Sequence, residues 1–209
     1  MNILSQILEH KIVAIIRGAN PGDVLKIAEA LHAGGVNLLE VTLNSDSALE
    51  VIKQLSDVMK GKMLIGAGTV LDADATKAAI DAGAQFIISP SFTVDVIKTT
   101  KQLGAISIPG AFTPTEIVNA YNTGGDIIKI FPASSNVNYI KEVRAPLSHI
   151  PLMPTGGVTL ENIGEFQKAG AVAFGIGTAL VNTKEKVTDA YLKNLTETAA
   201  KFVMAVGSN

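Results

Sequence analysis

Residues 37–70 read NLLEVTLNSDSALEVIKQLSDVMKGKMLIGAGTV, and this stretch decides the fold. Its first seven and last eight residues are short, mostly apolar runs, which are typical of buried strands. Between them, residues 47–61 repeat their apolar side chains at helical spacing, start at a serine and end at a glycine, as helix termini prefer. The stretch therefore predicts a strand, a helix and a second strand.

The same alternation extends to both ends of the chain. Further apolar runs begin at Ile12, Phe86, Ile106, Asp126, Pro151 and Ala171, and residues 23–35 and 159–170 have helical spacing. Eight strands, each followed by a helix, in a chain of about 200 residues match the lower size limit of a (β/α)8 TIM barrel. A doubly wound open sheet is the competing architecture, but it usually has a glycine-rich turn after its first strand. Residues 17–23, RGANPGD, lack that turn, so the barrel is favoured.

We expect one barrel domain over residues 1–209, with a short helix before Ile12 closing the floor of the barrel. The chain is 47% hydrophobic and 17% charged, as a globular protein is. Its net charge of −2 gives no electrostatic support for nucleic-acid binding. It contains no cysteine and no membrane-length apolar run, and residues 1–11 do not look like a signal peptide, so we predict a cytoplasmic protein without a membrane partner.

Three charged residues lie within or at the end of predicted strands: Arg17, Glu40 and Lys129. Side chains along a barrel strand alternate between the interior and the surrounding helices, and chemistry is carried out at the C-terminal ends of the strands. The residues that alternate with Glu40 and with Lys129 are all apolar, as faces covered by helices should be. Glu40 and Lys129 are therefore expected to point into the barrel, near its mouth.

Two interpretations of this pair stay open at this point. Glu40 and Lys129 could form a buried structural ion pair, because ion-pair networks also place charges inside proteins. Alternatively, desolvation lowers the pKa of Lys129, and its neutral amine attacks a ketone to form a Schiff base. The resulting iminium accepts electrons when a carbon–carbon bond breaks, and the carboxylate transfers the protons.

Glycine pairs follow the last two strands, where phosphate sites of such barrels are often built. The candidates are Gly156, Gly157, Gly177 and Thr178, with Thr155 beside them. Glycine lets backbone N–H groups approach an anion closely. The plainer interpretation is that these glycines only make tight turns, but their occurrence in both of the expected loops favours a phosphate site.

Seven segments together resemble the family of 2-keto-3-deoxy-6-phosphogluconate (KDPG) and 4-hydroxy-2-oxoglutarate (KHG) aldolases. They are LLEVTL, GAGTV, FIISP, IPGAFTPTE, IIKIFPA, PTGGV and GIGTAL, and they occur in the family's order from end to end of the chain. The resemblance implies a metal-free class I aldolase without a cofactor, usually a homotrimer. It also implies cleavage of KDPG to pyruvate and D-glyceraldehyde 3-phosphate.

The resemblance also implies roles for individual residues. Lys129 becomes the Schiff-base residue and Glu40 the general acid and base. The phosphate contacts fall on Gly156, Gly157, Gly177 and Thr178, and the pocket around the pyruvate moiety falls on Thr69, Pro90, Phe131 and Thr155.

This sequence departs from the family pattern after the segment EVTL, where many members have an arginine that binds the substrate carboxylate and Asn44 stands here. Other members have an arginine at the end of the first strand, as this chain does at Arg17. We therefore assign substrate anchoring to Arg17, because a forked guanidinium suits a carboxylate. An ion pair of Arg17 with Glu40 at the barrel rim is the alternative and is compatible with this role.

Several functions remain alternatives to KDPG cleavage. The same site could cleave the phosphogalactonate epimer or unphosphorylated 4-hydroxy-2-oxoglutarate, and the variable residues 133–138, ASSNVN, leave the stereopreference open. A phosphosugar isomerase or epimerase would use Glu40 as a base and Lys129 only as a charge. A barrel that binds a phosphorylated metabolite without catalysis is the alternative from another class.

Overall fold

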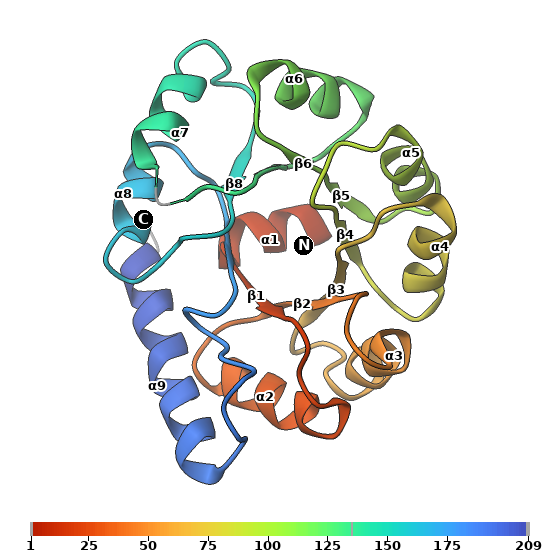
Figure 1. The fold of residues 1–209 in the computed structure, drawn as a ribbon, viewed down its shortest axis with the longest axis vertical. Coiled ribbons are helices and arrows are strands. Elements are labelled where there is room, and N and C mark those ends of the chain that lie inside the picture. The colour runs from red at the N-terminus through yellow and green to blue at the C-terminus, as the bar shows by residue number, and fades with distance from the viewer. Residues whose placement is uncertain (1, 135, 208–209) are drawn as a thin grey trace.

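The computed structural model describes residues 2–134 and 136–207 (Figure 1). The strands are β1 (Ile12–Ile16), β2 (Leu38–Thr42), β3 (Leu64–Gly68), β4 (Phe86–Ile88), β5 (Ile106–Ile108), β6 (Gly110–Ala111), β7 (Ile128–Ile130), β8 (Leu152–Pro154) and β9 (Phe174–Ile176). The helices are α1 (Ile3–His10), α2 (Pro21–Ala33), α3 (Ala48–Val58), α4 (Ala73–Asp81), α5 (Val94–Gln102), α6 (Pro114–Thr123), α7 (Val137–Arg144), α8 (Ile163–Lys168) and α9 (Asp189–Val206).

The strands form a ring of parallel neighbours surrounded by helices, as Figure 1 shows. Hydrogen bonds connect them in the orders β5-β4-β3-β2-β1-β9 and β6-β7-β8. A parallel bridge between Thr155 and Gly175 joins the end of β8 to β9. On the other side of the ring β5 and β6 follow each other in the chain with only Pro109 between them. The predicted (β/α)8 fold is confirmed.

The fifth predicted strand, residues 106–111, is divided into β5 and β6 at Pro109. Proline has no N–H group to donate to a neighbouring strand and is placed at breaks in the ladder. The carbonyl group of Pro109 still accepts a 2.9 Å hydrogen bond from the N–H of Lys129. The break therefore lies beside the strand that carries the candidate nucleophile.

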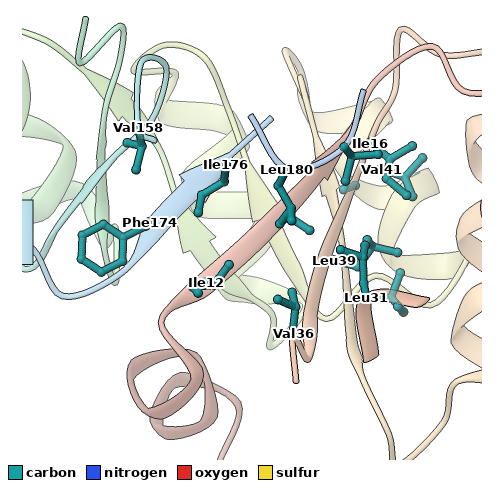
Figure 2. Close-up of a cluster of buried hydrophobic side chains, with 14 of the residues drawn as sticks. Ile12, Ile16, Leu31, Val36, Leu39, Val41, Val158, Phe174, Ile176 and Leu180 are labelled. Atoms are coloured by element: carbon teal, nitrogen blue, oxygen red, sulfur yellow. The ribbon is translucent and has the colours of Figure 1, made fainter. Parts of the chain in front are cut away.

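Apolar side chains cover both faces of the strands, which is why these runs fold as buried parallel strands. Figure 2 shows part of the outer cluster, in which Ile12 and Ile16 of β1 and Leu39 and Val41 of β2 pack together with Leu31 of α2. A second cluster fills the interior of the ring and includes Val13, Leu38, Phe86, Ile108, Ile127 and Met153.

Helix α1 closes the floor of the barrel, as predicted. Its ribbon crosses the centre of the ring in Figure 1, and its Ile7 is fully buried in the interior cluster. The helix begins after Asn2, whose side chain accepts a hydrogen bond from the N–H of Ser5. None of the helices in the part of the chain that the structure describes is long and apolar enough to cross a membrane.

The helix expected over residues 159–170 begins later, because α8 starts at Ile163. Asn162 precedes α8, and its side chain forms hydrogen bonds with the backbone of the loop before the helix. Its Oδ1 accepts a 2.8 Å hydrogen bond from the N–H of Thr159, and its Nδ2 donates a 2.8 Å hydrogen bond to the carbonyl of Gly157. The loop after β8 is therefore held by a side chain that the sequence pattern had placed inside the helix.

Candidate active site

Glu40 and Lys129 both point toward the barrel interior, as the alternation predicted. Their alternating neighbours Leu39, Val41, Ile128 and Ile130 lie in the outer cluster against the helices. Glu40 is the middle residue of β2 and Lys129 the middle residue of β7. Only 1% of Glu40 and 3% of Lys129 is exposed, so the site holds two almost fully buried ionisable groups.

Burial favours the neutral form of both groups. Desolvation lowers the pKa of Lys129 below the usual lysine range, with a smaller opposing effect from Glu40 and a smaller additional lowering from Arg17. Desolvation also raises the pKa of Glu40, and the positive charges of Lys129 and Arg17 partly offset that rise. Lys129 therefore loses its proton more readily than an ordinary lysine, and the neutral amine is the form that a Schiff-base nucleophile requires.

The two buried groups form no direct ion pair. The ion pairs within residues 2–134 and 136–207 are Lys26 with Asp23 and Lys101 with Asp126, and neither includes Glu40 or Lys129. The Oε2 atom of Glu40 is buried and has no hydrogen-bond partner among the described residues. A buried polar atom without a partner costs free energy, so this oxygen is well suited to accept a proton or a hydrogen bond from a bound molecule.

The carboxylate of Glu40 lies over Gly68, the last residue of β3. A Cβ atom built on Gly68 would lie 1.5 Å from Oε1 of Glu40, so only glycine leaves room for this side chain. Strands β2 and β3 are paired with Thr42 opposite Gly68. Gly68 therefore makes room for the Glu40 side chain, a contact that sequence reasoning missed, although the glycine-rich end of this strand was a usable signal.

Phe131 connects Lys129 to the open part of the site. The Nζ atom of Lys129 lies 4.9 Å from the centre of the Phe131 ring, within the range of a cation–π contact. Phe131 also lines a cavity of about 480 Å³ at the barrel mouth. Lys129 and Glu40 do not line this cavity, so the Phe131 ring is the contact between the buried lysine and the cavity wall.

The cavity brings together most of the predicted binding residues. It is lined by Arg17, Phe131, Thr155, Gly156, Gly157, Gly177 and Thr178. Thr69 and Pro90 do not line it. Thr69 follows Gly68 with a positive φ of 57°. Thr69 and Pro90 are half-buried and follow β3 and β4, on the other side of the ring from this cavity.

The loop after β8 has the backbone that the phosphate prediction requires. Gly156 and Gly157 have φ angles of 84° and 81°, a left-handed backbone conformation that residues other than glycine rarely adopt. The carbonyl of Gly156 accepts a 3.0 Å hydrogen bond from the N–H of Ser134 in the loop after β7. These glycines therefore make a tight turn and line the cavity at the same time.

Thr155 has a second unpaired polar atom at this end of the barrel. Its Oγ1 is buried and has no hydrogen-bond partner among the described residues. A Cβ atom on Gly175 would lie 2.3 Å from that oxygen, so only glycine at position 175 leaves room for the Thr155 side chain. Thr155 as a residue lines the cavity, so this unpaired hydroxyl lies next to the cavity wall.

Arg17 is exposed at the cavity mouth, and hydrogen bonds fix its backbone from two directions. The Thr183 hydroxyl donates a 2.7 Å hydrogen bond to the carbonyl of Arg17. The N–H of Gly18 donates a 2.8 Å hydrogen bond to Ser45, whose hydroxyl lies 3.0 Å from that of Thr42. Sequence reasoning missed Ser45, Thr183 and the cavity-lining Lys184, since nothing local marks them.

Asn44 is exposed and does not line the cavity, and the variable loop after β7 contains Ser135, which lies outside the described residues. In the described part of the chain, no group of three or more His, Cys, Asp or Glu side chains is arranged to hold a metal ion. The metal-free chemistry that the family resemblance implies rests on the buried Lys129 as the nucleophile.

Comparison with known proteins agrees with this geometry. The family model "KDPG and KHG aldolase" matches residues 3–196. A 2-dehydro-3-deoxy-6-phosphogalactonate aldolase of Escherichia coli is 34% identical over 196 residues, covering 93% of each chain. A 2-dehydro-3-deoxy-phosphogluconate aldolase of Pseudomonas aeruginosa is 36% identical over 160 residues, covering 76% of this chain and 72% of its own.

A solved structure of KDPG aldolase from Legionella pneumophila, with pyruvate captured at low pH as a covalent carbinolamine intermediate, superimposes with a TM-score of 0.86. It is 27% identical and covers 99% of each chain. The family match, the relatives and the buried lysine and glutamate at the barrel mouth lead to one conclusion: this chain belongs to the KDPG and KHG aldolase family.

Proposed function

We propose that this protein is a class I aldolase that cleaves KDPG to pyruvate and D-glyceraldehyde 3-phosphate through a Schiff base on Lys129. The observation that carries the proposal is the buried Lys129, whose pKa is lowered by desolvation and which forms no ion pair with Glu40. The carbinolamine in the Legionella pneumophila structure supports it, because a carbinolamine is the step before a Schiff base.

The reaction begins when the neutral amine of Lys129 attacks the C2 ketone and the carbinolamine loses water to give an iminium. Glu40, directly or through a water molecule, removes the proton of the C4 hydroxyl. The C3–C4 bond then breaks, its electrons move into the iminium, and the aldehyde leaves. The enamine takes a proton at C3, and hydrolysis of the resulting iminium releases pyruvate and the free amine.

The raised pKa of Glu40 suits both of its steps. A carboxyl group with a pKa nearer to neutrality accepts the C4 proton in its ionised form and returns a proton to C3 in its neutral form. Its unpaired Oε2 leaves one oxygen free for this exchange.

The substrate is held at both ends. Arg17 anchors the carboxylate, with Thr69, Pro90, Phe131 and Thr155 around the pyruvate moiety. The phosphate lies against the loops after β8 and β9, at Gly156, Gly157, Gly177 and Thr178, and the left-handed backbone of Gly156 and Gly157 supports this because glycine lets backbone N–H groups approach an anion closely.

A second candidate substrate is favoured by one comparison. The E. coli relative that covers 93% of this chain acts on the phosphogalactonate epimer, and Arg17 at the end of β1 replaces the arginine missing at Asn44. Cleavage of unphosphorylated 4-hydroxy-2-oxoglutarate is a further candidate of the same chemistry. Comparing kcat/KM for the two epimeric phosphorylated acids and for this acid ranks the three.

The test of the chemistry is covalent trapping. Incubation with pyruvate and borohydride should reduce the imine to a 1-carboxyethyl group on one lysine, and peptide mass spectrometry should find it on Lys129. Lys101→Arg, on the outer helix α5, should trap like the wild type, whereas Lys129→Arg should not. An adduct on another lysine, or none, contradicts the proposal. Turnover without an adduct would favour an isomerase or epimerase, and tight phosphate-ester binding without turnover a non-catalytic barrel.

We also propose that the chain forms one domain that assembles as a homotrimer. Leu71, Val94 and Phe112 are 55%, 39% and 48% exposed and lie on the loops and helix start after β3, β4 and β6, which are close in the ring. An exposed apolar group of this kind often marks an interface. Sedimentation should give a trimer for the wild type and smaller species for Phe112→Glu. A wild-type monomer would contradict the assembly. The cytoplasmic location stays a prediction.

A further inference from the structure

We propose that Lys184 is a second cationic contact of the substrate, directed to its phosphate group, and that Thr183 positions it. This inference rests on the proposed aldolase function and adds a residue that determines preference for phosphorylated substrates. Lys184 lies in the segment between β9 and α9, and its side chain is exposed.

The first observation is the charge of the cavity lining. The cavity that contains the glycine loops is lined by two cationic residues, Arg17 and Lys184, and by no carboxylate among the described residues. A phosphate monoester carries about −1.5 to −2 charges at pH 7, and the substrate also carries a carboxylate. With Arg17 anchoring the carboxylate, Lys184 is the cation that remains for the phosphate.

The second observation is that Lys184 belongs to an ordered turn. The N–H of Lys184 donates a 3.3 Å hydrogen bond to Oδ1 of Asn182, and Nδ2 of Asn182 donates a 2.6 Å hydrogen bond to Glu185. The N–H of Glu185 in turn donates to the carbonyl of Asn182 at 3.3 Å. Because the backbone on both sides of Lys184 is held, its Cα atom has a defined position at the cavity from which the exposed side chain extends.

The third observation connects this turn to the end of the neighbouring strand β1. The Thr183 hydroxyl donates its 2.7 Å hydrogen bond to the carbonyl of Arg17, across 166 positions of sequence. The two cations therefore lie on segments that are joined through a single side chain. This hydrogen bond holds together the two backbone segments from which the two cationic side chains extend to the same cavity.

The consequence is a specific effect on the phosphorylated substrate. An amine that pairs with a phosphate strengthens binding of that group, whereas a substrate whose distal end is an uncharged hydroxyl gains nothing from it. Lys184 should therefore set the ratio of kcat/KM for KDPG to kcat/KM for 2-keto-3-deoxygluconate, its dephosphorylated form.

The experiment compares Lys184→Gln with the wild type on both substrates. We expect the ratio of the two kcat/KM values to fall roughly tenfold, mainly through a higher KM for KDPG, since hydrogen bonds to charged groups are worth about that factor. Lys184→Arg should restore most of the ratio. Lys186→Gln, which removes an exposed lysine two positions away that does not line the cavity, is the matched control. An unchanged ratio in Lys184→Gln, or an equal fall in Lys186→Gln, overturns the inference.

Thr183→Val tests the positioning role. It removes the hydroxyl while keeping the shape of the side chain, so KM for KDPG should rise while kcat changes little, and the loss should not add to that of Lys184→Gln in the double variant. Fully additive losses overturn the positioning role. Borohydride trapping of pyruvate is measured in every variant: if the wild type forms no adduct the aldolase proposal fails, whereas normal trapping with an unchanged ratio rejects only the role of Lys184.

Discussion

The carboxylate of Glu40 lies so close over the backbone of Gly68 that a single added methyl group would come within 1.5 Å of Oε1. This contact connects the end of β3 to Glu40 on β2, the proposed proton-transfer group. The carboxylate can lie there because Gly68 has no side chain to occupy the space. Glycine at this position is thus a requirement of the site.

Gly68→Ala should displace Glu40 and lower kcat strongly. Overpacking in a dense interior costs about 1–3 kcal/mol of unfolding free energy, and misplacement of a proton-transfer group typically costs about a hundredfold or more in rate. Urea denaturation and steady-state kinetics measure the two effects. Gly164→Ala in helix α8 is the matched control, because a Cβ atom there meets nothing within 4 Å. Equal, small effects of both substitutions would contradict this role of Gly68.

The pH dependence of adduct formation should reveal the lowered pKa of Lys129. The neutral amine is the reactive form, so the rate of trapping at limiting pyruvate should rise with pH and level off well below the ordinary lysine pKa of 10.5. Arg17 lowers this pKa and Glu40 raises it. Arg17→Gln should therefore shift the midpoint to higher pH and Glu40→Gln to lower pH. Shifts in the same direction, or a wild-type midpoint near 10.5, would show that these charges do not act on the lysine as described.

Glu40→Gln should separate stability from catalysis. Because the pKa of Glu40 is raised in the folded protein, its neutral form contributes stability that is fully present below the unfolded value near 4.5 and is lost as pH rises through the folded pKa. The variant lacks this loss, so its unfolding free energy relative to the wild type should increase as pH rises from 4.5 toward 8. Its kcat should fall by about 10²–10⁴.

Denaturant titrations at several pH values check the stability part of that prediction. A stability difference that is independent of pH would mean that the carboxyl group of Glu40 has an ordinary pKa. A kcat near that of the wild type would remove Glu40 from the mechanism.

Sequence periodicity was sufficient for the barrel and for the direction of Glu40 and Lys129, because both depend on local alternation along a strand. The division of the fifth strand at Pro109 was missed, although the proline itself was a signal. The hydrogen bond between Thr183 and Arg17 joins residues 166 positions apart and depends on closure of the ring. No local pattern contains such a contact, and the same is true of Ser45 beneath Gly18.

The pocket prediction was partly limited for the same reason. The resemblance to the aldolase family assigned Thr69 and Pro90 to the pocket around the pyruvate moiety, but the cavity lies on the side of the ring formed by β1, β7, β8 and β9. Which side opens depends on the lengths and packing of the loops. The roles of Thr69 and Pro90 therefore stay predictions that substitution has to test.

Thr155→Val offers the clearest separation of folding from binding. Valine keeps the shape of threonine and removes a buried hydroxyl that has no hydrogen-bond partner in the described structure, so the unfolding free energy should stay the same or increase by up to about 1 kcal/mol. If the hydroxyl binds the substrate, kcat/KM for KDPG should fall roughly tenfold or more, since a bound polar group would lose its partner. Thr100→Val on helix α5 is the control, because its buried hydroxyl already donates a 2.6 Å hydrogen bond to the carbonyl of Val96. That variant should lose stability and keep its activity. A Thr155→Val enzyme that is less stable and fully active would show that the hydroxyl is paired within the protein and does not contact substrate.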